Sequence, residues 1–64
     1  MREADLRARL ENHLGPGNSL MWSDTVVLGA LGQRTVTQAL AVGVPCKQIW
    51  LAAWEALELP PRER

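Results

Sequence analysis

The residue types that carry most enzymatic and metal chemistry are sparse in this chain. It contains one cysteine, Cys46, and one histidine, His13, among 64 residues. A zinc site takes three or four ligands, so these two side chains alone cannot build one. The sequence also contains no nucleophile–base–orienter set, no phosphate loop and no glycine-rich dinucleotide fingerprint. We therefore expect a protein that is not an enzyme and that has no metal, cofactor or small-molecule substrate.

Cys46 and His13 both have ordinary structural interpretations. Cys46 falls in the first turn of a predicted helix beside Lys47, where the helix dipole and the cation would favour the reactive thiolate. The interpretation we prefer is a small side chain near the surface. His13 stands near the end of the first predicted helix, where we expect it to cap the last backbone carbonyl groups.

Asp24 is an acid on an otherwise apolar helical stripe that also holds Leu20, Val27 and Leu31. An unpaired carboxylate on such a stripe is costly to bury, so a partner is expected. Arg34, just beyond the predicted helix, is the natural partner. Because no second carboxylate or base accompanies Asp24, we predict a structural ion pair with Arg34 and not a catalytic acid.

Residues 35–57 fit the pattern of a helix-turn-helix. The motif needs a small residue inside its first helix and a glycine at the turn, and Ala39 and Gly43 occupy these two positions. In a DNA-binding protein the second helix would then enter the major groove. Many small bundles contain the same helix pair for packing alone, and packing is the interpretation we prefer.

The charges of the second helix fit DNA poorly, because Glu55 and Glu58 on it repel phosphate groups. Binding to DNA, weak and sensitive to salt, is the alternative function. The candidate DNA-contacting residues are Lys47, Gln48, Arg62 and Arg64.

A helical wheel of this last helix distributes its apolar residues unevenly. Trp50 lies on the buried side, whereas Leu51 falls among Lys47 and Glu55 on the polar side, and Trp54 lies on the border. Apolar and aromatic side chains on such a face are typical of protein interfaces. We predict that Leu51, Trp54, Lys47 and Glu55 bind a protein partner or a second copy of the chain. The alternative is that the rest of the bundle covers this side of the helix.

Glycine and proline divide the chain into predicted helices at residues 4–14, 19–31, 36–42 and 46–58, followed by a tail at 59–64. We expect Ser19 to cap the second helix and Gly32 to end it. Thr35 and Gln38 form a capping box at the start of the third helix, and Gly43 follows its end. The second segment is apolar on nearly every side, which predicts a position in the middle of the bundle. The predicted fold is all-α, a compact three- to four-helix bundle whose last two helices are arranged like a helix-turn-helix.

Length and composition limit the class of protein further. A chain of 64 residues forms one domain, and 47% hydrophobic residues are typical of a globular fold. Seven basic and seven acidic residues give a net charge of zero, which argues against a protein that works mainly by binding polyanions. A single cysteine and the charged segment that follows Met1 predict a cytoplasmic protein. The longest apolar runs fall far short of the roughly 20 residues of a membrane span, so we expect no membrane contact.

The chain contains an ordered set of short motifs: Leu14-Gly15-Pro16, Val27-Leu28, Leu31-Gly32-Gln33-Arg34-Thr35, Gln38-Ala39-Leu40, Gly43-Val44-Pro45, Ile49-Trp50 and Leu59-Pro60. This set resembles a small actinobacterial family, the domain-of-unknown-function family numbered 3046. The resemblance covers essentially the whole chain. It implies a small helical cytosolic protein of no assigned activity, often encoded near the recombinase of homologous recombination and its regulator. Trp54 stands where the family usually has cysteine. Leu51 stands where a basic residue is usual, and Arg7 and Asn18 where aromatic residues are frequent; these last three changes imply that a family-wide binding role is altered here.

Overall fold

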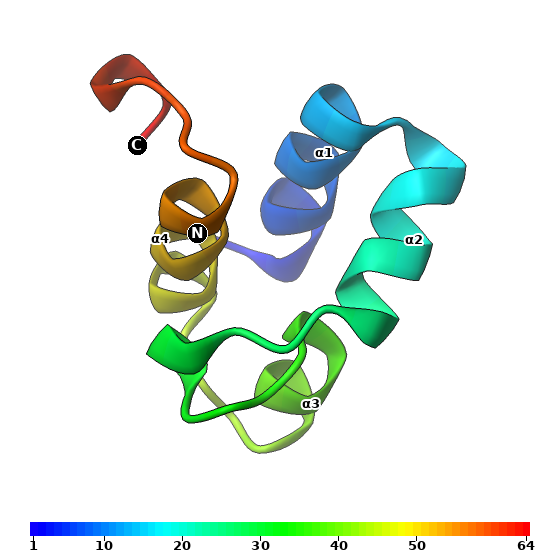
Figure 1. Cartoon of the computed structure of the whole chain (residues 1–64), viewed down its shortest axis with the longest axis vertical. Coiled ribbons are helices and arrows are strands. Elements are labelled where there is room, and N and C mark those ends of the chain that lie inside the picture. The colour runs from blue at the N-terminus through cyan, green and yellow to red at the C-terminus, as the bar shows by residue number, and fades with distance from the viewer.

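The computed structural model describes all 64 residues and contains four α-helices and two single-turn 3-10 helices (Figure 1). The α-helices are α1 (Glu3–Leu14), α2 (Pro16–Thr25), α3 (Val36–Ala41) and α4 (Cys46–Ala56), and the 3-10 helices are η1 (Gly29–Leu31) and η2 (Pro61–Glu63). An isolated bridge between Leu28 and Arg34 is the one β-type contact. The fold is all-α, as the sequence predicts. None of the helices combines the length and the apolar character needed to cross a membrane.

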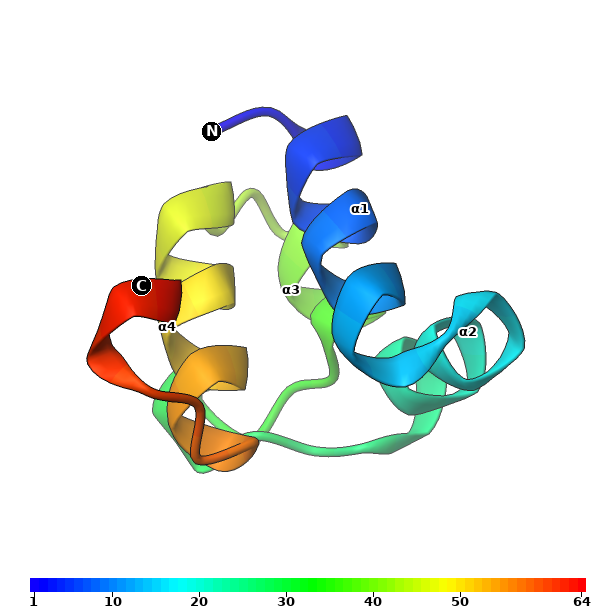
Figure 2. The same cartoon turned by 90° about the horizontal axis from the view of Figure 1, so that it is seen from above.

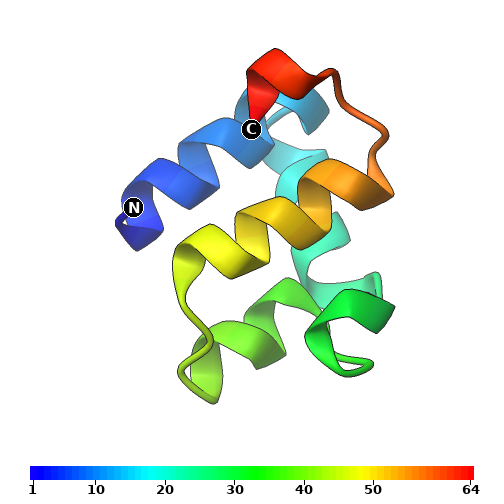
Figure 3. The ribbon, with the colours of Figure 1, turned by 90° about the vertical axis from the view of Figure 1, so that its left-hand side faces the viewer.

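Helix α4 lies in the middle of the molecule. The C-terminal tail and α1 lie on one side of it, and α3 and η1 lie on the other (Figure 3). Seen from above, α1 and α4 run beside each other and α2 projects away from them at the far end of α1 (Figure 2). The two predicted helix-turn-helix elements, α3 and α4, follow each other through a short turn at residues 42–45.

One core of ten buried hydrophobic residues holds the helices together. Helix α4 supplies the largest share, including Trp50, which is fully buried. Helix α1 contributes Leu6 and Leu10, which lie four residues apart and therefore on one face of the helix. The core residues are Leu6, Leu10, Leu28, Leu31, Val36, Ala39, Ile49, Trp50, Ala52 and Ala53.

Helix α2 differs from the prediction in both its bounds and its position. It begins at Pro16, whose missing N–H group costs nothing in the first turn of a helix, and it ends at Thr25 instead of Leu31. Ser19 is not its N-cap but a buried residue inside the helix, and its hydroxyl donates to the carbonyl oxygen of Pro16 at 3.0 Å. Leu20 is 58% exposed. The prediction of a central helix was therefore wrong, and α2 lies at the periphery.

The early end of α2 follows from the residues after Thr25. The side chains of Val26 and Val27 are branched at Cβ and favour extended backbone. The chain continues to Leu28, whose N–H donates to the carbonyl oxygen of Arg34 at 3.0 Å and closes a loop. Gly32, with a φ of 72°, ends η1 and not α2. The loop delivers Leu28 and Leu31 to the core without a continuous helix.

The ends of α3 are set by the predicted local signals. The hydroxyl oxygen of Thr35 accepts from the N–H of Gln38 at 3.1 Å, and the side-chain oxygen of Gln38 accepts from the N–H of Thr35 at 3.0 Å. This reciprocal pair is the capping box. At the other end Gly43 has a φ of 85°, and the N–H of Val44 donates to the carbonyl oxygen of Ala39 at 3.0 Å. These contacts form a Schellman termination.

Helix α4 ends two residues before the predicted position, at Ala56, with the same kind of termination. The N–H of Leu59 donates to the carbonyl oxygen of Trp54 at 3.1 Å. The N–H of Glu58 donates to the carbonyl oxygen of Glu55, also at 3.1 Å. The left-handed position of this motif usually holds glycine. Here it holds Glu58, with a φ of 54°.

Candidate functional site

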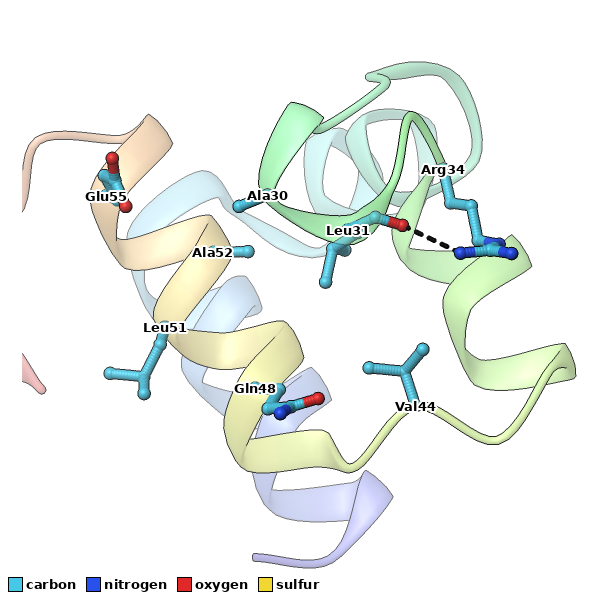
Figure 4. Close-up of a pocket in the computed structure, with 8 residues that line it drawn as sticks. All are labelled: Ala30, Leu31, Arg34, Val44, Gln48, Leu51, Ala52 and Glu55. Atoms are coloured by element: carbon cyan, nitrogen blue, oxygen red, sulfur yellow. Dashed lines mark hydrogen bonds between the residues drawn. The ribbon is translucent and has the colours of Figure 1, made fainter.

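An open groove with a volume of about 370 Å³ lies between α4 and η1 (Figure 4). Its walls are mainly apolar, and three polar side chains stand at its rim. The lining residues are Ala30, Leu31, Val44, Leu51 and Ala52, with Arg34, Gln48 and Glu55 as the polar rim. We call this site the α4–η1 groove.

The α4–η1 groove is built from three separate parts of the chain. Helix α4 contributes Ala52, which faces η1, and Leu51, which stands at the outer edge (Figure 4). Val44 comes from the turn between α3 and α4. Arg34 comes from the loop before α3, and its guanidinium donates to the carbonyl oxygen of Leu31 at 3.2 Å. The loop that shortens α2 therefore forms one wall of the groove.

Trp54 does not share this groove with Leu51. Its indole Nε1 donates to the carbonyl oxygen of Pro60 at 2.9 Å, and the guanidinium carbon of Arg64 lies 5.3 Å from the ring centroid. The tail therefore covers Trp54, as the alternative interpretation anticipated. Of the predicted partner surface, Leu51 and Glu55 line the α4–η1 groove, whereas the Nζ atom of Lys47 donates to the backbone oxygen of Arg64 at 2.8 Å.

Sequence reasoning missed the fold of the tail. The indole Nε1 of buried Trp50 donates to the carbonyl oxygen of Glu63 at 3.0 Å, and a guanidinium nitrogen of Arg9 donates to the backbone oxygen of Arg64 at 3.2 Å. One signal was available: a buried indole N–H needs an acceptor, and α4 cannot supply one because its own carbonyl groups are used by the helix.

A second groove, with a volume of about 440 Å³, lies between the tail and α1 and is lined only by polar and charged residues. We call it the α1–tail groove. Its lining residues are Arg9, Asn12, His13, Arg62, Glu63 and Arg64. His13 lies in the last turn of α1 as expected, but its ring stacks on Trp50 at a centroid distance of 5.9 Å, and its Nε2 lies 3.4 Å from a carboxylate oxygen of Glu63. The last turn of α1 is instead closed by the N–H of Gly15, which donates to the carbonyl oxygen of Glu11.

The four predicted DNA contacts fall at different sites. Gln48 lines the α4–η1 groove, whereas Arg62 and Arg64 line the α1–tail groove. Lys47 is bonded to the tail. The side chain of Arg62 is 83% exposed.

The predicted ion pair between Asp24 and Arg34 is wrong. The carboxylate of Asp24 accepts a hydrogen bond from the hydroxyl of Thr37, while Arg34 donates to Leu31. The reason is the early end of α2, which places Asp24 in the last turn within reach of Thr37 on α3, while Arg34 turns back to Leu31 in the loop. The role of Asp24 is to join α2 to α3.

The side chains that could react or bind a metal do not gather at one site. Cys46 is half-buried and packs against the core. No group of three or more His, Cys, Asp and Glu side chains is placed to hold a metal ion.

A third cleft, of about 300 Å³, lies beside α2. Sequence reasoning missed it because α2 was expected in the middle of the bundle. It is lined by Leu14, Asn18, Met21, Trp22, Thr25 and Val26. Met21 is 65% exposed, so this cleft is a second apolar surface beside the α4–η1 groove. Residues of α2 can therefore serve as controls when binding at the α4–η1 groove is tested.

The helices, the α4–η1 groove and the α1–tail groove define a small all-α protein with two sites of contrasting polarity. The chain belongs to the family described as "Protein of unknown function (DUF3046)", whose model matches residues 1–62. The resemblance carried by the short motifs is thereby confirmed. The chain matches no curated protein and no solved structure.

Proposed function

We propose that this chain is a non-enzymatic, cytoplasmic helical module that binds another protein in the α4–η1 groove. The observation that carries the proposal is the position of Leu51, half-buried at the edge of an open groove with apolar walls. Covering such walls removes apolar surface from water, which favours association. Cytoplasmic location is supported by the single free cysteine.

The rim of the groove favours a protein segment of a particular composition. Arg34 and Glu55 stand at opposite ends of the groove (Figure 4). A segment with an acidic residue at one end, a basic residue at the other and an apolar side chain between them would satisfy both charges and cover Leu51. Complementary charges of this kind orient a partner and select against wrong ones.

A second copy of the chain meets the same requirement. In a two-fold symmetric pair the same surface is used on both copies, so Arg34 of one copy would face Glu55 of the other. Zero net charge removes the general repulsion between copies. Light scattering after size exclusion distinguishes this case from binding to a different protein.

The variant that tests the groove is Leu51→Glu, with Leu20→Glu as the matched control. Leu20 lies on α2, is 58% exposed and lines none of the three clefts described above. We expect Leu51→Glu to lose the partner retained in affinity capture from the native cytosol, or to lower the mass of a dimer to that of a monomer, while Leu20→Glu behaves as wild type. Leu51→Gln removes the apolar side chain without adding charge and serves as a second test. Equal retention by all variants contradicts the proposal.

Weak DNA binding, in an accessory role in recombination or repair, is the second candidate. It is supported by the α3–turn–α4 connection and by the exposed side chains of Arg62 and Gln48. Titration with duplex and single-stranded DNA at low salt, followed by tryptophan fluorescence, tests it. Non-specific binders reach dissociation constants of about 10⁻⁴–10⁻⁶ M at physiological salt, so no response at high micromolar DNA would exclude this role.

A further inference from the structure

The α1–tail groove concentrates positive charge in a chain whose net charge is zero. Three of the seven basic residues, Arg9, Arg62 and Arg64, line it, and Glu63 is its one acidic residue. With His13 counted as neutral, the side chains of the lining carry a net charge of +2. None of the six lining residues is hydrophobic. The groove therefore suits a polar anion and not the apolar segment that the α4–η1 groove would take.

Contacts within the chain hold two of these guanidinium groups in place. The guanidinium carbons of Arg9 and Arg64 lie 5.3 Å from the ring centroids of Trp50 and Trp54, respectively. Arg9 and Lys47 both donate to the backbone oxygen of Arg64, which fixes this part of the tail against α1 and α4. A guanidinium has five N–H donors. The side chain of Arg9 uses one of them in a hydrogen bond to the protein and that of Arg64 uses none, so most of these donors are available to a ligand. Donors that are positioned and unsaturated bind an anion at a small entropic cost.

We propose that the α1–tail groove binds the phosphate monoester group of a small polar molecule, a site beyond the proposed protein-binding function. Guanidinium groups match phosphate oxygens in geometry and can bond them in pairs. A phosphate monoester carries a charge of about −1.5 to −2 at pH 7, which neutralises the lining, whereas a carboxylate leaves it positive. A volume of about 440 Å³ lies within the usual range of small-molecule sites, about 300–1,000 Å³.

A nucleic acid fits the same groove less well. Its phosphodiester groups carry one charge each and repeat along the strand, so affinity depends on a long basic surface. Here Glu63 stands between Arg62 and Arg64 in the chain and shares the groove with them. The adjoining cleft, which shares Arg9 and Asn12, adds Lys47 but also Asp5. The positive charge is therefore local and suits a single dianion.

Nuclear magnetic resonance titrations with inorganic phosphate and with glycerol phosphate, at constant ionic strength maintained with sodium chloride, test the proposal. We expect saturable shifts of the indole N–H signals of Trp50 and Trp54 and of the backbone signals of residues 62–64. Arg62→Gln should weaken binding at least about fivefold, because it removes one charge-assisted contact. Its side chain is 83% exposed, and its one ion pair, with Glu63 at 4.0 Å, is a weak surface contact, so the change should leave the fold intact. Arg34→Gln, the same change in the α4–η1 groove, is the matched control and should bind as wild type does.

Three results would overturn the proposal. The first is a linear response that follows ionic strength and does not saturate. The second is equal weakening by Arg62→Gln and Arg34→Gln, which would show that overall charge and not this groove attracts phosphate. The third is tighter binding of duplex DNA than of glycerol phosphate through the same residues, which would assign the groove to nucleic acid.

Discussion

The indole N–H of Trp50 donates a hydrogen bond to the carbonyl oxygen of Glu63, at 3.0 Å. Trp50 is fully buried, so this bond supplies the partner that its N–H group would otherwise find in water. Together with the bond from Trp54 to Pro60, it makes the tail an integral part of the fold. The two bonds hold the tail over the aromatic side of α4, and the apolar side chains that α4 presents to the α4–η1 groove are Leu51 and the small Ala52.

Replacing Trp50 by phenylalanine should destabilise the protein by about 2 kcal/mol, because the change removes one hydrogen bond and part of a buried ring system. Urea unfolding followed by circular dichroism measures the free energy of unfolding. Trp22→Phe is the control, since Trp22 is half-buried and its indole forms no hydrogen bond within the chain. Equal losses for the two variants would show that the bond to Glu63 contributes nothing.

Glu58→Gly should stabilise the protein by about 0.5–1 kcal/mol, because glycine adopts the left-handed backbone that Glu58 holds without the steric cost of a Cβ atom. Gly43→Ala, at the equivalent position after α3, should destabilise by about 1 kcal/mol for the same reason. Thermal unfolding of both variants checks the pair. Glu58→Ala keeps the Cβ atom and should leave the melting temperature close to that of wild type.

Double-mutant cycles should show that Asp24 is coupled to Thr37 and not to Arg34. We expect a coupling energy of about 0.5–1 kcal/mol between Asp24→Ala and Thr37→Val, because the hydrogen bond joins them. Between Asp24→Ala and Arg34→Gln it should be close to zero. A clear coupling in the second cycle would restore the ion pair predicted from sequence.

Features governed by neighbouring residues could be predicted from the sequence. The capping box of Thr35 and Gln38 and the glycine turn at Gly43 each depend on fewer than ten residues, and both lie where expected. The length of α2 could not be predicted in this way. Its apolar continuation through Leu31 matches a helix, but the core takes Leu28 and Leu31 from a loop held by the bond between Leu28 and Arg34.

Only the part of the candidate site that lies on α4 could be predicted, because only that part depends on a local pattern. A helical wheel places Leu51 on the outer side of α4 correctly, but it contains no information on which other segments approach that helix. The second wall of the groove comes from the loop that was expected to be helical. The cover over Trp54 comes from a tail that turns back at Pro60. Both depend on the path of the chain and not on local pattern.

Site-specific photo-crosslinking in the native cytosol tests the proposed protein-binding function most directly. A benzophenone amino acid in place of Gln48, at the rim of the α4–η1 groove, should form one discrete adduct with a partner protein or with a second copy. The same amino acid in place of Leu20 should form none, although Leu20 is 58% exposed. An adduct from position 20 or from Met21 in the cleft beside α2, with none from position 48, would contradict the assignment of the α4–η1 groove as the binding site.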